Sequence, residues 1–144
     1  MTALVFLPAP TPPLTEDAHL TLVWAGDQAV ASVVSQLTFQ GQAFARQHKA
    51  FPARVLGTAM FGQNHDEPVL LIELTSQIAL LRAVVAQYSQ SEYTEFRPHI
   101  AVPSLSGRRF VDLRLRPEVV YFNRLAVWAG EEHGEGETVW WMGT

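Results

Sequence analysis

The sequence predicts an α+β domain in which two helices cover one face of mostly antiparallel β-sheets. Three observations predict this class: short stretches that alternate apolar and polar residues, two segments of helical apolar periodicity that each follow a pair of strands, and a length of 144 residues, which suits one domain spanning 1–144. The expected order is ββαββαββββ. Each half of the chain contains one helix and several strands, which indicates a duplicated layout without a residue-level repeat.

The first half of the chain begins with two strands and a long helix. Ala3–Leu7 is a short apolar strand, and the four prolines that follow it favour a stiff, extended loop. Ala18–Ala25 alternates in polarity, and we expect Trp24 on its inward face, in the core. Asp27 is predicted to cap a helix that runs to about Gln47. The apolar stripe of this helix consists of Val30, Val33, Val34, Leu37, Gly41, Phe44 and Ala45.

The remaining elements follow from the same patterns. Two strands, Arg54–Phe61 and Val69–Leu74, precede a second helix that Thr75 or Ser76 caps, with Ile78, Leu81, Val85 and Tyr88 as its buried stripe. The last four expected strands are His99–Val102, Val111–Arg116, Tyr121–Ala129 and Thr138–Met142. Because neighbouring side chains alternate in a strand, Trp140 and Trp141 point opposite ways, and we expect one of them to be exposed.

Composition limits the classes of function. The net charge of −4 does not favour long nucleic acid, although six of the ten basic residues fall between Arg97 and Arg124 and could serve a small anionic ligand. The absence of cysteine excludes disulfides and thiol catalysis, and the five histidines lack the helical pairing of a zinc site, so no metal is expected. No apolar run approaches a bilayer span, and the first residues lack a signal-peptide pattern, so we expect a cytoplasmic protein without membrane partners.

Two short segments resemble each other. They are His19-Leu20-Thr21-Leu22 and His99-Ile100-Ala101-Val102, each with a histidine at the start of a strand. If these strands lie side by side, both imidazoles project into the same cleft. One imidazole can then deprotonate the nucleophile that attacks a phosphodiester while the other protonates the leaving oxygen, and Thr21 can donate to a phosphoryl oxygen. Single strand histidines are more often structural, which is our interpretation of His48, His65 and His133.

These two motifs, eighty residues apart and with Pro98 directly before His99, resemble those of the two-histidine (2H) phosphoesterase family. This family includes 2′,5′ RNA ligase-like proteins and cyclic phosphodiesterases. The resemblance implies a bilobal fold with pseudo-two-fold halves around a central cleft. It also implies cofactor- and metal-independent cleavage of a small nucleotide or cyclic oligonucleotide, with His19 and His99 as catalytic residues and Thr21 as a phosphate ligand. The short chain is similar to compact viral and bacterial members, some of which degrade cyclic oligonucleotide defence signals.

The chain departs from the family pattern at Ala101, which cannot supply the hydroxyl of the second motif. Ser104, Arg97 or the Arg108-Arg109 turn could replace it at the phosphate. Tyr93 could stack a base at the rim of the cleft, although packing is the commoner role of such a residue. The departure motivates an alternative, a nucleotide-sequestering module with the same cleft and weakened catalysis. A third alternative is an unrelated interaction domain. The sequence leaves open the substrate linkage, the acid and base assignment and the oligomeric state.

Overall fold

The computed structural model describes residues 1–10, 14–62, 64–93, 95–101, 117–130 and 136–144, and in these ranges it has the predicted α+β class. The elements are β1 (Thr2–Pro8), β2 (His19–Trp24), α1 (Ala31–Gln47), β3 (Phe51–Phe61), β4 (Glu67–Ile72), α2 (Ser76–Val85), the 3₁₀ turn η1 (Ala86–Tyr88), β5 (His99–Ala101), β6 (Val119–Ala129) and β7 (Thr138–Trp141). The strand predicted at Val111–Arg116 lies outside the described residues, as does Val102.

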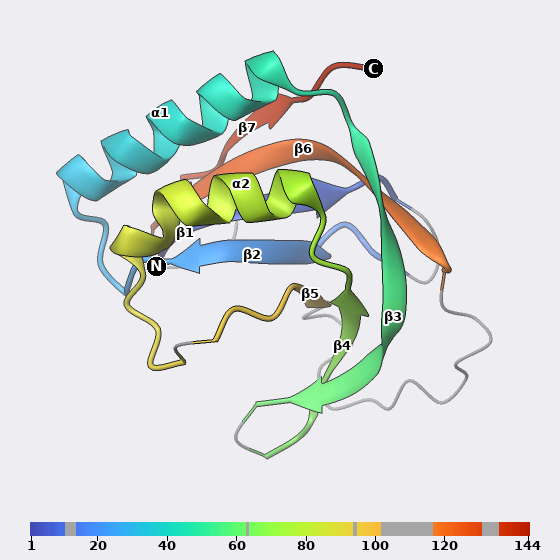
Figure 1. Cartoon of the computed structure of the whole chain (residues 1–144). Helices are drawn as coiled ribbons and strands as arrows, with labels where there is room; N and C mark the ends of the chain where they lie inside the picture. The colour runs from blue at the N-terminus through green and yellow to red at the C-terminus, as the bar shows by residue number, and fades with distance from the viewer. Residues whose placement is uncertain (11–13, 63, 94, 102–116, 131–135) are drawn as a thin grey trace.

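The seven described strands form one sheet in the order β1-β2-β5-β4-β3-β6-β7. Every pairing between these strands is antiparallel. Strand β1 also pairs with β6, so six of the strands close into a ring, and β7 extends from β6 alone. The helices α1 and α2 contact each other and lie side by side over β1, β2 and β6 (Figure 1). Neither described helix is long and apolar enough to cross a bilayer.

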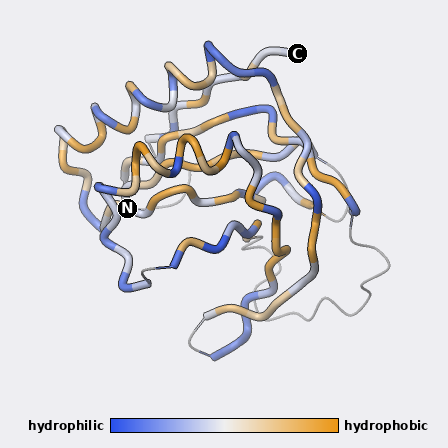
Figure 2. The backbone as a smooth tube through the Cα atoms, in the orientation of Figure 1, coloured by the Kyte–Doolittle hydropathy of each residue, from blue (hydrophilic) through white to orange (hydrophobic). Residues whose placement is uncertain are grey.

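The main core lies between the two helices and the sheet. Four phenylalanines pack edge-on or tilted at its centre, with ring centroids 5.3–5.7 Å apart: Phe6, Phe44, Phe51 and Phe122. The strands beneath the helices are mostly apolar, whereas the outer turns of α1 are hydrophilic (Figure 2). The predicted stripe of α1 buries Leu37, Gly41, Phe44 and Ala45, while Val30 precedes the helix and is exposed.

Two local predictions at the end of β2 and the start of α1 are wrong. The pairing of β1 with β2 skips Leu22, so the alternation reverses there, and Val23 enters the core while Trp24 is only half-buried. Asp27 does not cap α1, which begins at Ala31 without a side-chain cap. The chain from Gly26 to Gln28 instead runs along the start of β1 and accepts hydrogen bonds from Met1 and Thr2.

The predicted start of α2 is confirmed. The Thr75 hydroxyl accepts a hydrogen bond of 3.2 Å from the Ile78 N–H, which satisfies one of the free donors of the first turn. The helix ends at Val85, and Tyr88 packs against the core from η1.

The face of the sheet that points away from the helices carries a second, smaller apolar cluster. Its buried residues are Ala3, Val5, Leu7, Ala126 and Trp128. We call this side of the sheet the site face, because the two histidine motifs lie on it.

Candidate functional site

The two histidine motifs lie on adjacent strands. Strands β2 and β5 pair antiparallel, with His19 opposite Ala101 and Leu20 opposite Ile100. Leu20 and Ile100 are fully buried in the main core. Because side chains alternate in a strand, the residues on either side of them point to the site face. The structure therefore brings His19, Thr21, His99 and Ala101 together on one face, as the shared-cleft hypothesis requires.

Both imidazoles have the same hydrogen-bond partner two residues earlier in the chain. His19 Nδ1 lies 2.8 Å from the Asp17 carbonyl oxygen, and His99 Nδ1 lies 2.7 Å from the Arg97 carbonyl oxygen. A carbonyl oxygen can only accept, so Nδ1 carries the hydrogen in each ring. Nε2 is then the nitrogen of the neutral ring that accepts a proton. The two bonds fix the orientation and the tautomer of both histidines.

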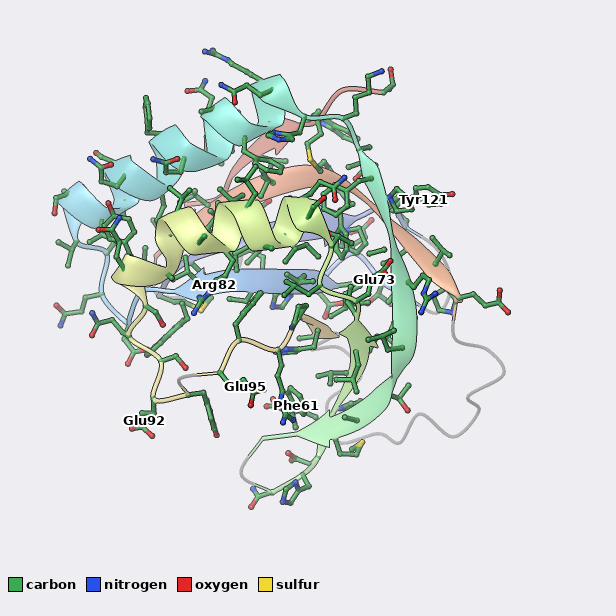
Figure 3. All side chains as sticks on the ribbon, in the orientation of Figure 1. Phe61, Glu73, Arg82, Glu92, Glu95 and Tyr121 are labelled. Carbon is green, nitrogen blue, oxygen red and sulfur yellow. The ribbon has the colours of Figure 1, made fainter. Side chains whose placement is uncertain are left out.

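Each imidazole also packs edge-on against an aromatic ring. The ring centroids of His19 and Trp128 are 4.7 Å apart, and so are those of His99 and Phe61. Phe61 lies at the far end of β3, close to the loop that joins it to β4 (Figure 3). These contacts hold the rings against the sheet and exclude water from one side of each.

The strand register shows that the two halves are related. From β5, pairing continues to Leu71 on β4 opposite His99, and then to Gly57 on β3 opposite Leu71. From β2, one step beyond the Phe6–Leu20 pair places Leu7 opposite His19, and Arg124 on β6 pairs with Leu7. These pairings end at Arg124 on β6 in the first half and at Gly57 on β3 in the second. Trp128, which contacts His19, lies four residues after Arg124, and Phe61, which contacts His99, lies four residues after Gly57. The duplicated layout is therefore present in the register, with few identical residues.

Burial sets the charge preference of His99. The ring is half-buried, and desolvation lowers the pKa of the His99 imidazole below its ordinary value of 6.5, while the hydrogen bond to the Arg97 carbonyl opposes this in part. The neutral ring, which can accept a proton at Nε2, is favoured at neutral pH.

The other predicted site residues lie in different surroundings. Thr21 is half-buried beside the histidines, and Ala101 presents only a methyl group to the site face, between His19 and Val69. The Arg97 side chain is exposed and forms an ion pair of 3.6 Å with Glu95. Tyr93 is 82% exposed in the segment that precedes β5. Ser104, Arg108 and Arg109 lie outside the described residues.

Four residues of the site could not be predicted from the types of residue in the sequence. The Asp17 and Arg97 carbonyls act through the backbone, and only their matched position, two residues before each histidine, could have indicated them. Trp128 and Phe61 depend on strand pairing between distant segments. In the part of the chain that the structure describes, no three His, Asp or Glu side chains gather as metal ligands would.

Comparison with known proteins gives matches in structure only: no family model and no curated protein sequence matches the chain. TT0787 of Thermus thermophilus has a TM-score of 0.59 at 18% identity, over 96% of this chain and 92% of that one. A phosphoesterase structure has a TM-score of 0.61 at 15% identity, over 99% and 98%. E. coli LigT complexed with 3′-AMP has a TM-score of 0.60 at 16% identity, over the same shares. The chain therefore has, over nearly its whole length, the fold of these structures, E. coli LigT among them.

Proposed function

We propose that the chain is a phosphodiesterase that cleaves a small RNA-like or cyclic nucleotide by paired-histidine acid–base catalysis, without a metal ion. The matched hydrogen bonds from Nδ1 of His19 and His99 to backbone carbonyls carry this proposal. They give both rings one tautomer on one face of adjacent strands, which suits two proton transfers at a single phosphate. Structures of E. coli LigT with 3′-AMP, ATP and NADP+ support a nucleotide as ligand of this fold.

The two rings share the acid and base roles in this proposal. Nε2 of one neutral ring removes the proton of a water molecule or a 2′-hydroxyl as that oxygen bonds to phosphorus. The other ring, protonated at Nε2, gives its proton to the leaving oxygen as the second P–O bond breaks. One proton is taken up and one is released, so the step balances, and the two rings exchange protonation states.

Thr21 is the phosphate ligand in this proposal. Its hydroxyl donates to a non-bridging oxygen, where negative charge grows in the transition state. Ala101 supplies no second donor, and the loss of one such donor costs about 2.7–4 kcal/mol in the barrier. We assign the replacement to Arg97, whose guanidinium can neutralise phosphate charge, or to Ser104, whose hydroxyl can donate a hydrogen bond, and we expect a slow enzyme.

A substrate panel tests the proposal. The protein is incubated with cyclic mono-, di- and trinucleotides and with 2′,5′-oligoadenylate, with and without EDTA, and the products are separated by chromatography. We expect turnover of at least one compound, unchanged by EDTA. Cleavage of a cyclic di- or trinucleotide would support a role in removing defence signals. Activity that EDTA abolishes would contradict the metal-independent mechanism.

The methyl group of Ala101 beside His19 favours a second candidate function, a nucleotide-sequestering module with the same cleft. Stoichiometry distinguishes the two. A sequestering module retains about one equivalent of intact ligand per chain, whereas an enzyme converts many equivalents.

A further inference from the structure

We propose that Arg124 and Trp141 form a nucleobase-binding subsite on the His19 side of the candidate active site. This inference rests on the proposed function in one respect, namely that the ligand is a nucleotide. It adds the position of the base, which would be bound on the His19 side of the reacting phosphate.

The two tryptophans at the end of β7 have different environments. Trp140 packs against the main core, where a Cβ on Gly41 would come within 3.1 Å of its ring. Trp141 points to the opposite side and is 69% exposed, whereas Trp128 on the neighbouring strand is 2% exposed. A large aromatic ring that is left in solvent beside a candidate active site has the properties of a stacking platform for a base.

Arg124 holds a positive charge over this ring. Its guanidinium carbon lies 5.3 Å from the Trp141 ring centroid. Nη2 donates to the Pro8 carbonyl at 2.8 Å and Nε to Asn123 Oδ1 at 3.1 Å, so the group is held in place. Among the described residues, Arg124 takes part in neither of the two ion pairs, which join Arg54 to Glu73 and Arg97 to Glu95. The charge is therefore available to an anionic ligand as well as to the indole ring.

Strand pairing places this pair on the site face beside His19. Arg124 is opposite both Leu7 on β1 and Trp141 on β7. The pairing of β1 with β2 ends at Phe6 and Leu20, and its register, extended by one residue, places Leu7 opposite His19. Val139, which shares the face of Trp141, packs against the apolar cluster of the site face. At about 4.8 Å between strands, Arg124 is roughly 10 Å and Trp141 roughly 14 Å from His19 along the sheet. A nucleoside next to the reacting phosphate can span this interval.

Among the residues that the structure describes, the other half of the site has no counterpart of this pair. The register position that corresponds to Arg124 is Gly57 on β3, where a Cβ would meet nothing within 4 Å. Among the described residues, this position, two strands from His99, therefore carries no charged side chain, and the described strand β7 extends the sheet on the side of β6. This asymmetry predicts that the base of a ligand is held on the His19 side.

Binding of two matched probes tests the subsite independently of catalysis. AMP and ribose 5-phosphate share the sugar and the phosphate and differ in the base. By isothermal titration calorimetry we expect AMP to bind the wild-type chain more tightly. Trp141→Ala should weaken AMP binding by about 5-fold to 100-fold, to the level of ribose 5-phosphate, and leave ribose 5-phosphate unchanged. Trp141→Phe should restore part of the difference.

Phe39→Ala is the matched control, since Phe39 is 64% exposed on α1, outside the site face. It should leave both affinities unchanged. Equal affinity of the wild type for the two probes, or an unchanged AMP affinity in Trp141→Ala, would overturn the subsite even if the chain cleaves nucleotides. A loss of AMP binding at Trp141 in a chain without turnover would support the subsite and contradict the proposed catalysis.

Discussion

His19 on β2 lies directly opposite Ala101 on β5. The residue that lacks the hydroxyl of the second motif is therefore the immediate neighbour of the first histidine. Extended by one residue, the same register places Thr21 opposite His99, so the hydroxyl of the first motif lies on the strand position next to the second histidine. In the proposed mechanism each motif would supply the group beside the other motif's histidine, and the missing hydroxyl at Ala101 would affect the surroundings of His19.

Ala101→Thr should increase turnover. The new hydroxyl would stand beside His19 as Thr21 stands beside His99, and one added transition-state donor can raise kcat by up to about 100-fold. The measurement is kcat for the best substrate of the panel. Threonine suits a strand, so the melting temperature should not fall. An unchanged kcat in a folded variant would show that another group already replaces the missing hydroxyl.

Thr21→Val should lower kcat by about 100-fold or more, because valine keeps the shape of threonine and removes the donor. Thr21→Ser should retain much of the activity. Both variants should unfold at nearly the wild-type temperature. If Thr21→Val kept full activity, the hydroxyl would have no part in stabilising the transition state.

His99 should make stability depend on pH. Its pKa is lower in the folded chain than in the unfolded chain, so the folded state binds fewer protons. This stabilising contribution is complete above pH 6.5 and is lost as the pH falls below 6.5 through the folded pKa. Urea unfolding should therefore show a larger loss of stability between pH 7 and pH 5 for the wild type than for His99→Asn. An equal loss in both chains would contradict the lowered pKa.

Arg82 should be a positioning residue. It extends from α2 toward β2, where Nη1 donates to the Leu22 carbonyl at 2.6 Å, and its guanidinium lies 4.7 Å from the Phe96 ring centroid (Figure 3). It thus links β2 to the segment before His99. Arg82→Met should destabilise the fold by about 1.5 kcal/mol, because the Leu22 carbonyl loses a charged donor.

Urea unfolding measures this loss of stability, and the pH profile of kcat tests the positioning role. If Arg82 were purely structural, its loss would leave the pH profile unchanged. If Arg82 positions the segment before His99, its loss should displace the Arg97 carbonyl that bonds to His99 and shift the part of the pH profile that reports the His99 pKa. Arg82→Lys keeps a donor and should restore part of the stability.

The strands, both helices and the two motifs could be predicted because their signals are local. Periodicity alone places His19 and Thr21 on one face of β2. The predictions for Trp24 and Asp27 are wrong because both residues depend on a distant segment. The register shift between β1 and β2 turns Trp24 outward, and the backbone carbonyl of Asp27 accepts a hydrogen bond from Met1 at the start of β1. The Arg124–Trp141 pair follows from the register of β6 and β7, which no local pattern contains.

The most direct test of the paired-histidine account is turnover by His19→Asn and His99→Asn. The asparagine amide can keep the hydrogen bond that Nδ1 donates, while the proton-transferring Nε2 is lost. His48→Asn is the control, because Nδ1 of His48 bonds to the Phe44 carbonyl in the same way, at 3.0 Å, beyond the end of α1. We predict that each of the first two variants loses at least about 100-fold in kcat with little change in melting temperature, and that the control retains activity. Near-wild-type turnover by either His19→Asn or His99→Asn would contradict the account.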